Sequence, residues 1–295
     1  LEILERDYDY ETIDRILASG DSDRPTAIRV NTEKISVTAF SEKLRQNGIT
    51  VERGSMNDTS LLISGYDYIR KVPGFFDGEF VVQDQSSCLA VKAAGINEGD
   101  LVVDVCAAPG GKTMYAAMLT GSEGHVISRD LIDKKTELIE ENIERLGLSN
   151  VTVQVHDARE FDEELTGKAD VVIADLPCSG LGIMGRKNDI KYHVSMESVK
   201  ELAQLQREIL DTVCRYVKPG GTLVYSTCTI DSIENDENAV WFADTHDFSL
   251  CGIDDVVPEH GGERGFVTLH QGIDECDGFF ISKFRADSNN QIGQE

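Results

Sequence analysis

Short apolar runs alternate with helical patterns through the part of the chain that follows residue 100. The apolar runs are rich in β-branched residues and cover 101–106, 125–129, 151–155, 170–174 and 222–226. Patterns with apolar residues at helical spacing occupy 112–120, 133–146 and 197–217. Strands that alternate with helices form parallel sheets, because each helix carries the chain back to the start of the next strand. The sequence therefore predicts an α/β fold with a doubly wound sheet, and later runs at 247–253 and 278–286 predict an antiparallel edge.

The stretch from Leu101 to Thr113 reads as a strand, a glycine turn and the start of a helix. This geometry lets backbone N–H groups and a helix N-terminus approach a ligand closely. A P-loop would need glycine where Cys106 stands, and the first glycine of a dinucleotide fingerprint is also missing. These mismatches disfavour a P-loop NTPase and a nicotinamide enzyme. The remaining interpretation is that this segment binds a nucleotide-like ligand through a different type of loop.

The chain before residue 86 has a different character and is predicted to form a small α+β subdomain. A helix is expected from Tyr10 to Gly20, and another over about 37–47 lies between two strand-like runs. Segment 24–71 carries eight basic and five acidic side chains, so it is a candidate RNA-binding surface, with an ordinary solvated surface as an equal alternative. The expected domains are residues 1–85 and 86–286, and the polar tail 287–295 is predicted to be disordered.

Composition excludes several classes of protein. The net charge of −25 argues against an unspecific polyanion binder, although a local basic surface can still hold RNA. Seven cysteines without any C-x-x-C pair argue against a disulfide framework and a zinc site, and they favour a reducing cytoplasm with no metal. No apolar run is long enough to span a membrane. The chain begins at Leu1, so we expect part of a longer protein, and we expect it to be a monomer.

Acidic residues stand at the ends of four predicted strands, namely Asp104, Asp130, Asp157 and Asp175. Ligands of open α/β sheets bind beyond the carboxyl ends of the strands, so these side chains are candidates for one crevice. Asp130 follows Gly110 by twenty residues, which suits a carboxylate that accepts from ribose hydroxyls. Asp157 is a candidate acceptor for an adenine amine. For any one of these acids, capping of the next helix is an equal alternative.

Two cysteines stand in loops just beyond strands. Cys178 lies in "ADLPCSGLG" and Cys228 in "YSTCTI", each among small polar residues, whereas Cys88, Cys214 and Cys251 are expected to be packing residues. A thiolate is a strong nucleophile, so two thiols near a nucleotide site indicate a covalent adduct and a second thiol that helps to resolve it.

Several motifs together resemble the Sun-type RNA cytosine-5 methyltransferases, which use S-adenosylmethionine. They are "DVCAAPGGKT", "DLPCSGLG", "STCTI" and "DGFFISKF". The further stretches "RPTAIRVNT", "VPGFFDGEFVVQDQSS" and "RKNDIKY" are similar to the bacterial small-subunit ribosomal RNA branch called RsmB or Fmu. The resemblance covers about residues 10 to 286 and implies a Rossmann-like class I methyltransferase domain. We expect this chain to lack the helical N-terminal domain resembling NusB that is usual in that branch.

The resemblance also implies roles for individual residues. Cys228 would be the nucleophile, Cys178 would assist its release, and Asp175 would hydrogen-bond the pyrimidine. The cofactor would lie against Cys106, Ala107, Ala108, Pro109, Gly110, Gly111 and Lys112, with Asp130, Asp157 and Asp175 completing its pocket. RNA contacts are expected at Arg29, Arg186, Lys187 and Lys191.

Three alternatives accompany the expected methylation of 16S ribosomal RNA. A transfer RNA cytosine could be the substrate of the same chemistry. A DNA cytosine-5 methyltransferase would attack with the cysteine of its Pro-Cys loop, here Cys178, and would not need Cys228. An inactive RNA-binding assembly factor would retain the fold alone, although the presence of both cysteines and the pocket acids disfavours it.

Overall fold

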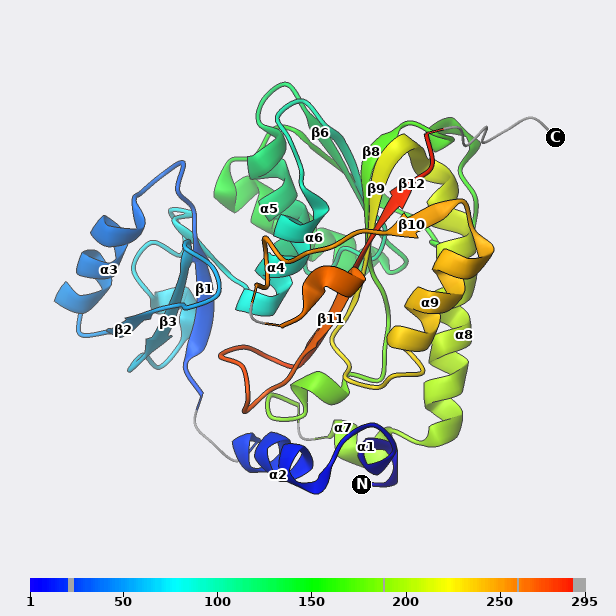
Figure 1. Cartoon of the computed structure of the whole chain (residues 1–295). Helices are drawn as coiled ribbons and strands as arrows, with labels where there is room; N and C mark the ends of the chain where they lie inside the picture. The colour runs from blue at the N-terminus through cyan, green and yellow to red at the C-terminus, as the bar shows by residue number, and fades with distance from the viewer. Residues whose placement is uncertain (21–23, 188, 259, 289–295) are drawn as a thin grey trace.

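The computed structural model describes residues 1–20, 24–187, 189–258 and 260–288, and it contains two separate β-sheets (Figure 1). The larger sheet has strand order β10-β12-β9-β8-β5-β6-β7, with β11 pairing to β12. Its parallel strands are β5 (Leu101–Asp104), β6 (His125–Asp130), β7 (Val151–Val155), β8 (Ala169–Asp175) and β9 (Val217–Thr227). The predicted parallel sheet is therefore confirmed.

The antiparallel edge of the large sheet is also confirmed. Strand β12 (Phe279–Ala286) runs antiparallel to β9, and it pairs in turn with β10 (Phe248–Leu250) and β11 (Phe266–Leu269). The sequence did not predict β11. Backbone N–H of Asp287 donates to the carbonyl of Asp247 at 3.0 Å, and residues 289–295 of the predicted disordered tail lie outside the described part of the chain.

Helices cover both faces of the large sheet. Helices α4 (Gln85–Ala94) and α5 (Gly111–Thr120) bury their apolar residues against one face, and α8 (Met196–Val213) and α9 (Asp236–Thr245) bury theirs against the other (Figure 1). Helix α6 (Asp133–Leu146) has the predicted bounds. Helix α8 ends four residues earlier than predicted, because Cys214–Tyr216 form a 3₁₀ turn and Val217 begins β9.

The smaller sheet forms the predicted α+β unit. Its antiparallel strands β1 (Thr26–Val30), β2 (Thr50–Arg53), β3 (Ser60–Ser64) and β4 (Phe80–Val82) have the order β2-β3-β1-β4. Helix α3 (Val37–Gln46) packs against it, and buried Ile28, Phe40 and Leu61 belong to its core. Strand β2 was not predicted, because only one of its four residues is buried.

The first helices pack against the large domain rather than against the small sheet. Helices α1 (Glu2–Asp7) and α2 (Tyr10–Ser19) bury Leu4 and Ile16 in one cluster with Leu181 and Ile230. The short helix α7 (Ile190–His193) contributes Ile190 to that cluster. The division into residues 1–85 and 86–286 stays a prediction, and α1 and α2 contact residues of its second part. No helix in the described part of the chain is long and apolar enough to cross a membrane.

Candidate active site

The loop after β5 is the predicted cofactor loop, and its path depends on small residues. Gly110 adopts a φ of 99° and precedes α5, and a Cβ placed there would lie 2.8 Å from Cε of Met114. The N–H of Ala107 donates to the carbonyl of Arg129 at 2.8 Å, which ties the loop to β6. Burial raises the pKa of the Cys106 thiol, so this cysteine is a packing group of the loop rather than a reactive thiolate.

The strand-end acids occupy different positions. Asp130 accepts from the backbone N–H of Ala108 at 3.1 Å and of Ile132 at 3.2 Å, so it holds the cofactor loop. Asp175 accepts from Nζ of Lys112 at 2.7 Å and from Oγ of Ser226 at 2.8 Å. Asp157 instead pairs with Arg159 at 2.7 Å, and the hydrogen bonds from Arg159 lower the pKa of its carboxyl.

Asp104 is the fourth strand-end acid and is fully buried. One of its carboxylate oxygens accepts from Oγ1 of Thr113 at 2.7 Å, and the other has no hydrogen-bond partner among the described residues. Burial raises the pKa of this carboxyl from 3.8 to about 7. At mildly acidic pH the buried carboxyl of Asp104 is therefore protonated and neutral.

The raised pKa of Asp104 predicts a specific pH dependence of stability. Between the unfolded pKa of 3.8 and the folded value of about 7, the folded chain holds a proton that the unfolded chain has released, so the free energy of unfolding falls as pH rises through this window. The loss is about 4 kcal/mol at 1.36 kcal/mol per pKa unit. We expect Asp104→Asn to lack this loss. In urea unfolding, the stability of the variant relative to the unmodified chain should therefore be higher at pH 8 than at pH 4. A pH-independent difference between the two chains would contradict this.

Cys178 and Cys228 lie side by side at the ends of adjacent strands. Strands β8 and β9 are parallel neighbours with Asp175 opposite Ser226, so the loops that follow them meet. The two Sγ atoms are 3.3 Å apart. The sequence indicated that both thiols stand near one site, and the structure brings them into direct contact.

The two thiols differ in acidity. The hydrogen bond from Cys178 lowers the pKa of the Cys228 thiol, and Lys112 and Lys187 act in the same direction against burial and the charge of Asp175. The pKa of Cys178 is raised because it is the donor to Cys228, because it is buried, and because the charges of Cys228 and Glu234 oppose its ionisation. Of the two thiols, Cys228 is therefore the one that loses its proton more readily.

A buried carboxylate fixes the two cysteine loops relative to each other. Glu234 accepts from the backbone N–H of Ser179 at 2.9 Å and from Nε2 of Gln206 at 2.9 Å. Oγ of Ser179 and Oγ1 of Thr229 are hydrogen-bonded at 2.7 Å, which joins the residues that directly follow the two cysteines. The sequence analysis missed Glu234, because its partners lie in distant segments and no local motif marks it.

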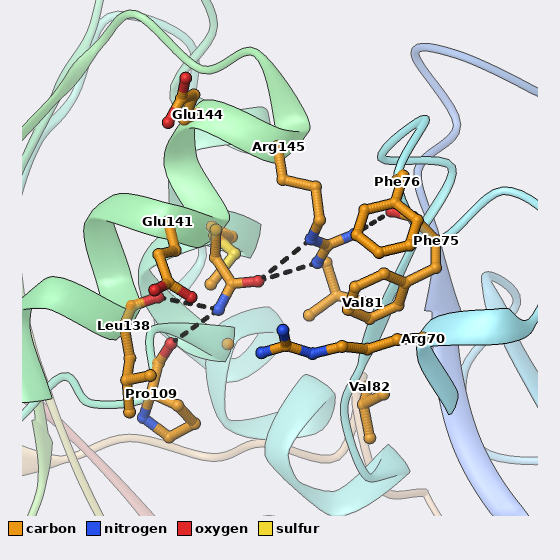
Figure 2. A pocket seen from close by; sticks show the side chains of 13 residues that line it. Arg70, Phe75, Phe76, Val81, Val82, Pro109, Leu138, Glu141, Glu144 and Arg145 are labelled. Atoms are coloured by element: carbon orange, nitrogen blue, oxygen red, sulfur yellow. Dashed lines mark hydrogen bonds between the residues drawn. The ribbon is translucent and has the colours of Figure 1, made fainter. Parts of the chain in front are cut away.

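A cavity of about 310 Å³ opens beside Cys228. It is lined by Val82, Gln83, Asp84, Ser86, Ser87, Ala107, Ala108, Pro109, Gly111, Lys112, Asp175, Ile183, Cys228, Asp277 and Phe279. The cavity brings together the cofactor loop, Asp175 and the predicted nucleophile, whereas Asp130 and Asp157 do not line it. A second cavity of about 520 Å³ adjoins it and shares Val82, Pro109 and Gly111 with it (Figure 2).

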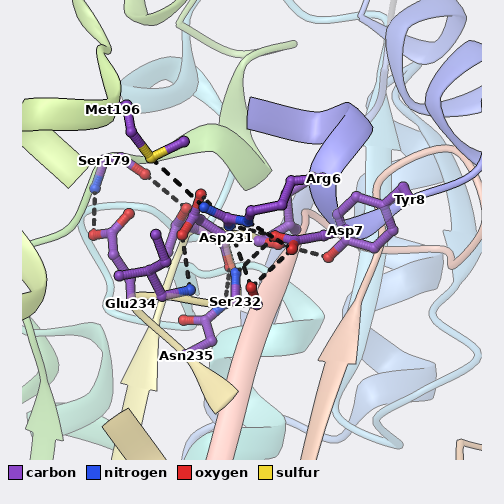
Figure 3. A network of polar contacts seen from close by, with 12 residues as sticks. Arg6, Asp7, Tyr8, Ser179, Met196, Asp231, Ser232, Glu234 and Asn235 are labelled. Atoms are coloured by element: carbon purple, nitrogen blue, oxygen red, sulfur yellow. Dashed lines mark hydrogen bonds and ion pairs between the residues drawn. The ribbon is translucent and has the colours of Figure 1, made fainter. Parts of the chain in front are cut away.

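The N-terminal helices support the loop that carries Cys228 (Figure 3). Nη2 of Arg6 contacts Oδ2 of Asp231 at 2.9 Å, and Asp7 accepts from the backbone N–H of Ser232 at 3.0 Å. The hydroxyl of Tyr8 donates to the carbonyl of Ile230 at 2.5 Å. Residues 230–232, just after Cys228, are therefore held from the outside by residues 6–8.

The four residues expected to contact RNA lie in different environments in the structure. Arg29 is only 1% exposed, lies 4.3 Å from the ring centroid of Tyr115 and donates to Gln83 at 2.7 Å, so the prediction that it binds RNA is wrong. Arg186 pairs with Asp277 at 2.6 Å, and Lys187 is exposed. Lys191 belongs to α7, and its side chain lies outside what the structure describes. No group of His, Cys, Asp or Glu side chains suited to a metal ion occurs among the described residues.

Family models and curated relatives both point to one protein family. Residues 92–285 match the family model described as 16S rRNA methyltransferase RsmB/F, and residues 1–67 match the ferredoxin-like domain model of the same group. The chain is 37% identical over 288 residues to the probable ribosomal RNA small subunit methyltransferase B of Bacillus subtilis, covering 94% of this chain and 63% of that protein. It is 32% identical to the small subunit methyltransferase F of Escherichia coli, covering 93% and 60% respectively. The chain thus spans less than two thirds of the length of these relatives.

Solved structures share the fold. A methyltransferase homologue from Pyrococcus horikoshii superposes with a TM-score of 0.81 at 27% identity, covering 97% of this chain and 98% of that one. NSun6 from the same organism, solved with SFG, an analogue of S-adenosylmethionine, has a TM-score of 0.83 at 22% identity and covers 96% of both chains. These likenesses agree with the predicted Rossmann-like methyltransferase fold.

Proposed function

Because the chain belongs to the 16S ribosomal RNA methyltransferase RsmB/F family, we propose that it transfers a methyl group from S-adenosylmethionine to carbon 5 of a cytosine in small-subunit ribosomal RNA. The family depends on S-adenosylmethionine. The position of the methyl group and the covalent route to it are proposals, and they are argued from the geometry of this chain.

The observation that carries the proposal is the asymmetric pair of thiols at the cavity. Carbon 5 of cytosine is a poor nucleophile until a group adds at carbon 6, and a thiolate is the side chain best suited to that addition. Cys228 is the thiol with the lowered pKa and it lines the cavity, whereas Cys178 has a raised pKa and contacts Cys228 at 3.3 Å. This asymmetry favours Cys228 as the nucleophile and disfavours the DNA-type assignment to Cys178.

The first half of the reaction is an addition followed by methyl transfer. Sγ of Cys228 forms a bond to carbon 6 and the electrons of the carbon 5–carbon 6 double bond move into the ring. Asp175 hydrogen-bonds the nitrogen edge of the base, and Lys112, which contacts Asp175 at 2.7 Å, adds positive charge where the ring becomes electron-rich. S-adenosylmethionine supplies the methyl group, which carbon 5 takes from the sulfonium sulfur. The target base must be unpaired or flipped out to reach this cavity.

The second half is an elimination assisted by Cys178. Once Cys228 is a thioether, Cys178 no longer faces a neighbouring thiolate, so two of the causes of its raised pKa disappear. The Cys178 thiol can then give its proton to solvent and accept the proton of carbon 5. The electron pair of that C–H bond restores the ring double bond, and the bond between carbon 6 and sulfur breaks to return the Cys228 thiolate.

The residues present fit the cofactor at the loop after β5. The loop residues Ala107, Ala108, Pro109 and Gly111 line the cavity with small side chains, so a ligand can lie against the backbone. Asp130, whose carboxylate already accepts from the N–H of Ala108 at 3.1 Å, stands at the end of β6 where a ribose would lie.

Asp130→Ala is expected to weaken the binding of S-adenosylmethionine about 10- to 150-fold, because hydrogen bonds to a charged acceptor contribute about 1.5–3 kcal/mol. Calorimetry measures the change. Glu160→Ala, which removes an exposed acid outside the cavity, is the matched control and should bind normally. Unchanged affinity of the Asp130 variant would refute the ribose assignment.

Methyl transfer to defined RNA tests the proposed function. The chain is incubated with radiolabelled S-adenosylmethionine and an in vitro transcript of small-subunit ribosomal RNA, and the RNA is digested to nucleosides. The proposal predicts label in 5-methylcytidine. Label only with transfer RNA would identify the alternative substrate, and label only with DNA would point to the Cys178 mechanism. Absence of label from every substrate would support an inactive binding protein.

A further inference from the structure

The 520 Å³ cavity beside the active site is a groove between the small domain and helix α6. We call it the Phe76 groove. Its walls come from the segment 70–82 of the small domain and from α6, and Pro109 of the cofactor loop lies at its end (Figure 2). Because it shares Val82, Pro109 and Gly111 with the cavity of Cys228, a polymer held in one cavity can continue into the other.

Exposed apolar side chains line this groove. Phe76 is 73% exposed, Val82 48% and Leu138 43%, although large apolar side chains of a folded chain are mostly buried. The Phe76 and Phe75 rings are nearly perpendicular, with 5.3 Å between centroids, and the high exposure of Phe76 leaves its ring open to solvent. A free aromatic face is the feature on which an unpaired base stacks.

Two guanidinium groups face the same groove. Arg145 is held by the carbonyls of Phe75 at 2.8 Å and Phe80 at 3.0 Å, and Arg70 reaches across the groove towards α6 (Figure 2). Among the described residues, no ion pair involves either arginine. Burial and the charge of Arg70 lower the pKa of Arg145, so the two guanidinium groups are near enough to repel each other.

Carboxylates of α6 limit where an anion can bind. Glu141 and Glu144 also line the groove, and Figure 2 shows Glu144 at the end far from Arg70. Arg70 and Arg145 therefore supply the positive charge of the groove, and Glu141 and Glu144 border it on α6. In a chain with a net charge of −25, two arginines without a carboxylate partner beside an exposed aromatic ring indicate a phosphate and a base rather than an acidic peptide.

We propose that the Phe76 groove binds one unpaired nucleotide of the RNA substrate next to the methylated base. The base of this nucleotide stacks on Phe76, and its phosphate contacts Arg70. The proposal rests on the proposed function, because that function places the target base in the adjoining cavity. The Phe76 groove would be an additional site, which holds the neighbouring nucleotide in an unpaired state.

Two variants test the stacked base and the phosphate separately, and two exposed residues elsewhere serve as controls. Phe76→Ala and Arg70→Ala are compared with Tyr10→Ala, which removes an aromatic ring that is 84% exposed outside the groove, and with Lys200→Ala, which removes an exposed cation of α8. Fluorescence anisotropy with the small-subunit RNA transcript gives the Kd at several salt concentrations. Calorimetry with S-adenosylmethionine checks that all four variants keep the fold and the cofactor site.

The groove variants should weaken RNA binding in two distinguishable ways. Phe76→Ala is expected to raise the Kd about 5- to 150-fold without changing the salt slope, because stacking contributes about 1–3 kcal/mol per base and is not ionic. Arg70→Ala should reduce the slope of log K against log salt by about 1, because one phosphate contact is lost. The control variants should bind within about twofold of the unmodified chain.

Three outcomes would overturn the proposal. If both groove variants bind RNA normally and the unmodified chain methylates RNA, the groove does not bind the neighbouring nucleotide, whereas the proposed function is unaffected. Equal losses from Tyr10→Ala and Lys200→Ala would show that the groove has no special role. An unmodified chain that neither binds nor methylates the transcript would refute the proposed function and the groove together.

Discussion

Replacing Cys228 by alanine is expected to abolish methyl transfer, with a loss on the order of 10⁴-fold or more. The reason is chemical: without addition at carbon 6, carbon 5 of cytosine does not attack the methyl donor. The variant should still bind S-adenosylmethionine, because the cofactor loop and Asp130 are intact. Release of labelled methyl groups into RNA measures the reaction.

Cys251→Ala is the matched control for the loss of a thiol. Cys251 is partly exposed, lies after β10 and contacts the carbonyl of Ser249 at 3.6 Å, outside the cavity. The control should methylate RNA at the normal rate. If Cys228→Ala retained more than a small fraction of the activity of this control, the thiolate would not be the essential nucleophile.

The substitution Gly182→Ala is expected to have the largest effect on the architecture of the site. A Cβ at this position would lie 2.1 Å from the carbonyl oxygen of Gly278 and 2.8 Å from that of Cys228. Both are backbone atoms, and Gly182 itself donates to the Cys228 carbonyl at 3.0 Å, so the two cysteine loops must separate. We expect a loss of about 3 kcal/mol in the free energy of unfolding and about 100-fold in methyl transfer.

Urea unfolding of Gly182→Ala should be compared with that of Gly20→Ala. Gly20 has a φ of −69°, and an added Cβ would lie 3.2 Å from its nearest neighbour, the carbonyl of Leu17. This control requires a shift of only a few tenths of an ångström and should lose far less stability. Similar stability and activity of the two variants would show that the contact between the cysteine loops is not required.

The large domain was predictable because its strands are buried on both faces and its helices have one apolar face. Helix α6 matched its predicted bounds, since Ile139 and Leu146 mark a regular buried stripe that ends before Gly147. Strand β11 was missed although Gly265 directly precedes it, because it is only four residues long and two of them are buried. The docking of α1 and α2 was also missed, because local periodicity does not show which surface an apolar face covers.

The cysteines were predictable, whereas their surroundings were not. Each cysteine follows a strand, and adjacent parallel strands bring their ends together, so sequence order sufficed for Cys178 and Cys228. The difference in pKa depends on their contact and on Lys112 and Glu234, which only the folded chain brings near. Arg29 was misassigned because its charge was counted without regard to burial, and it lies on the buried side of β1.

Trapping of the covalent intermediate tests the central claim most directly. Labelled small-subunit RNA transcript is incubated with S-adenosylmethionine and the unmodified chain, Cys178→Ala, Cys228→Ala or the double variant, and the products are run on a denaturing gel. Cys178→Ala should accumulate a denaturant-resistant protein–RNA band, because addition and methyl transfer proceed while elimination stalls. Cys228→Ala and the double variant should show none. A shifted band from Cys228→Ala would contradict the account, because it would place the nucleophile in the other loop.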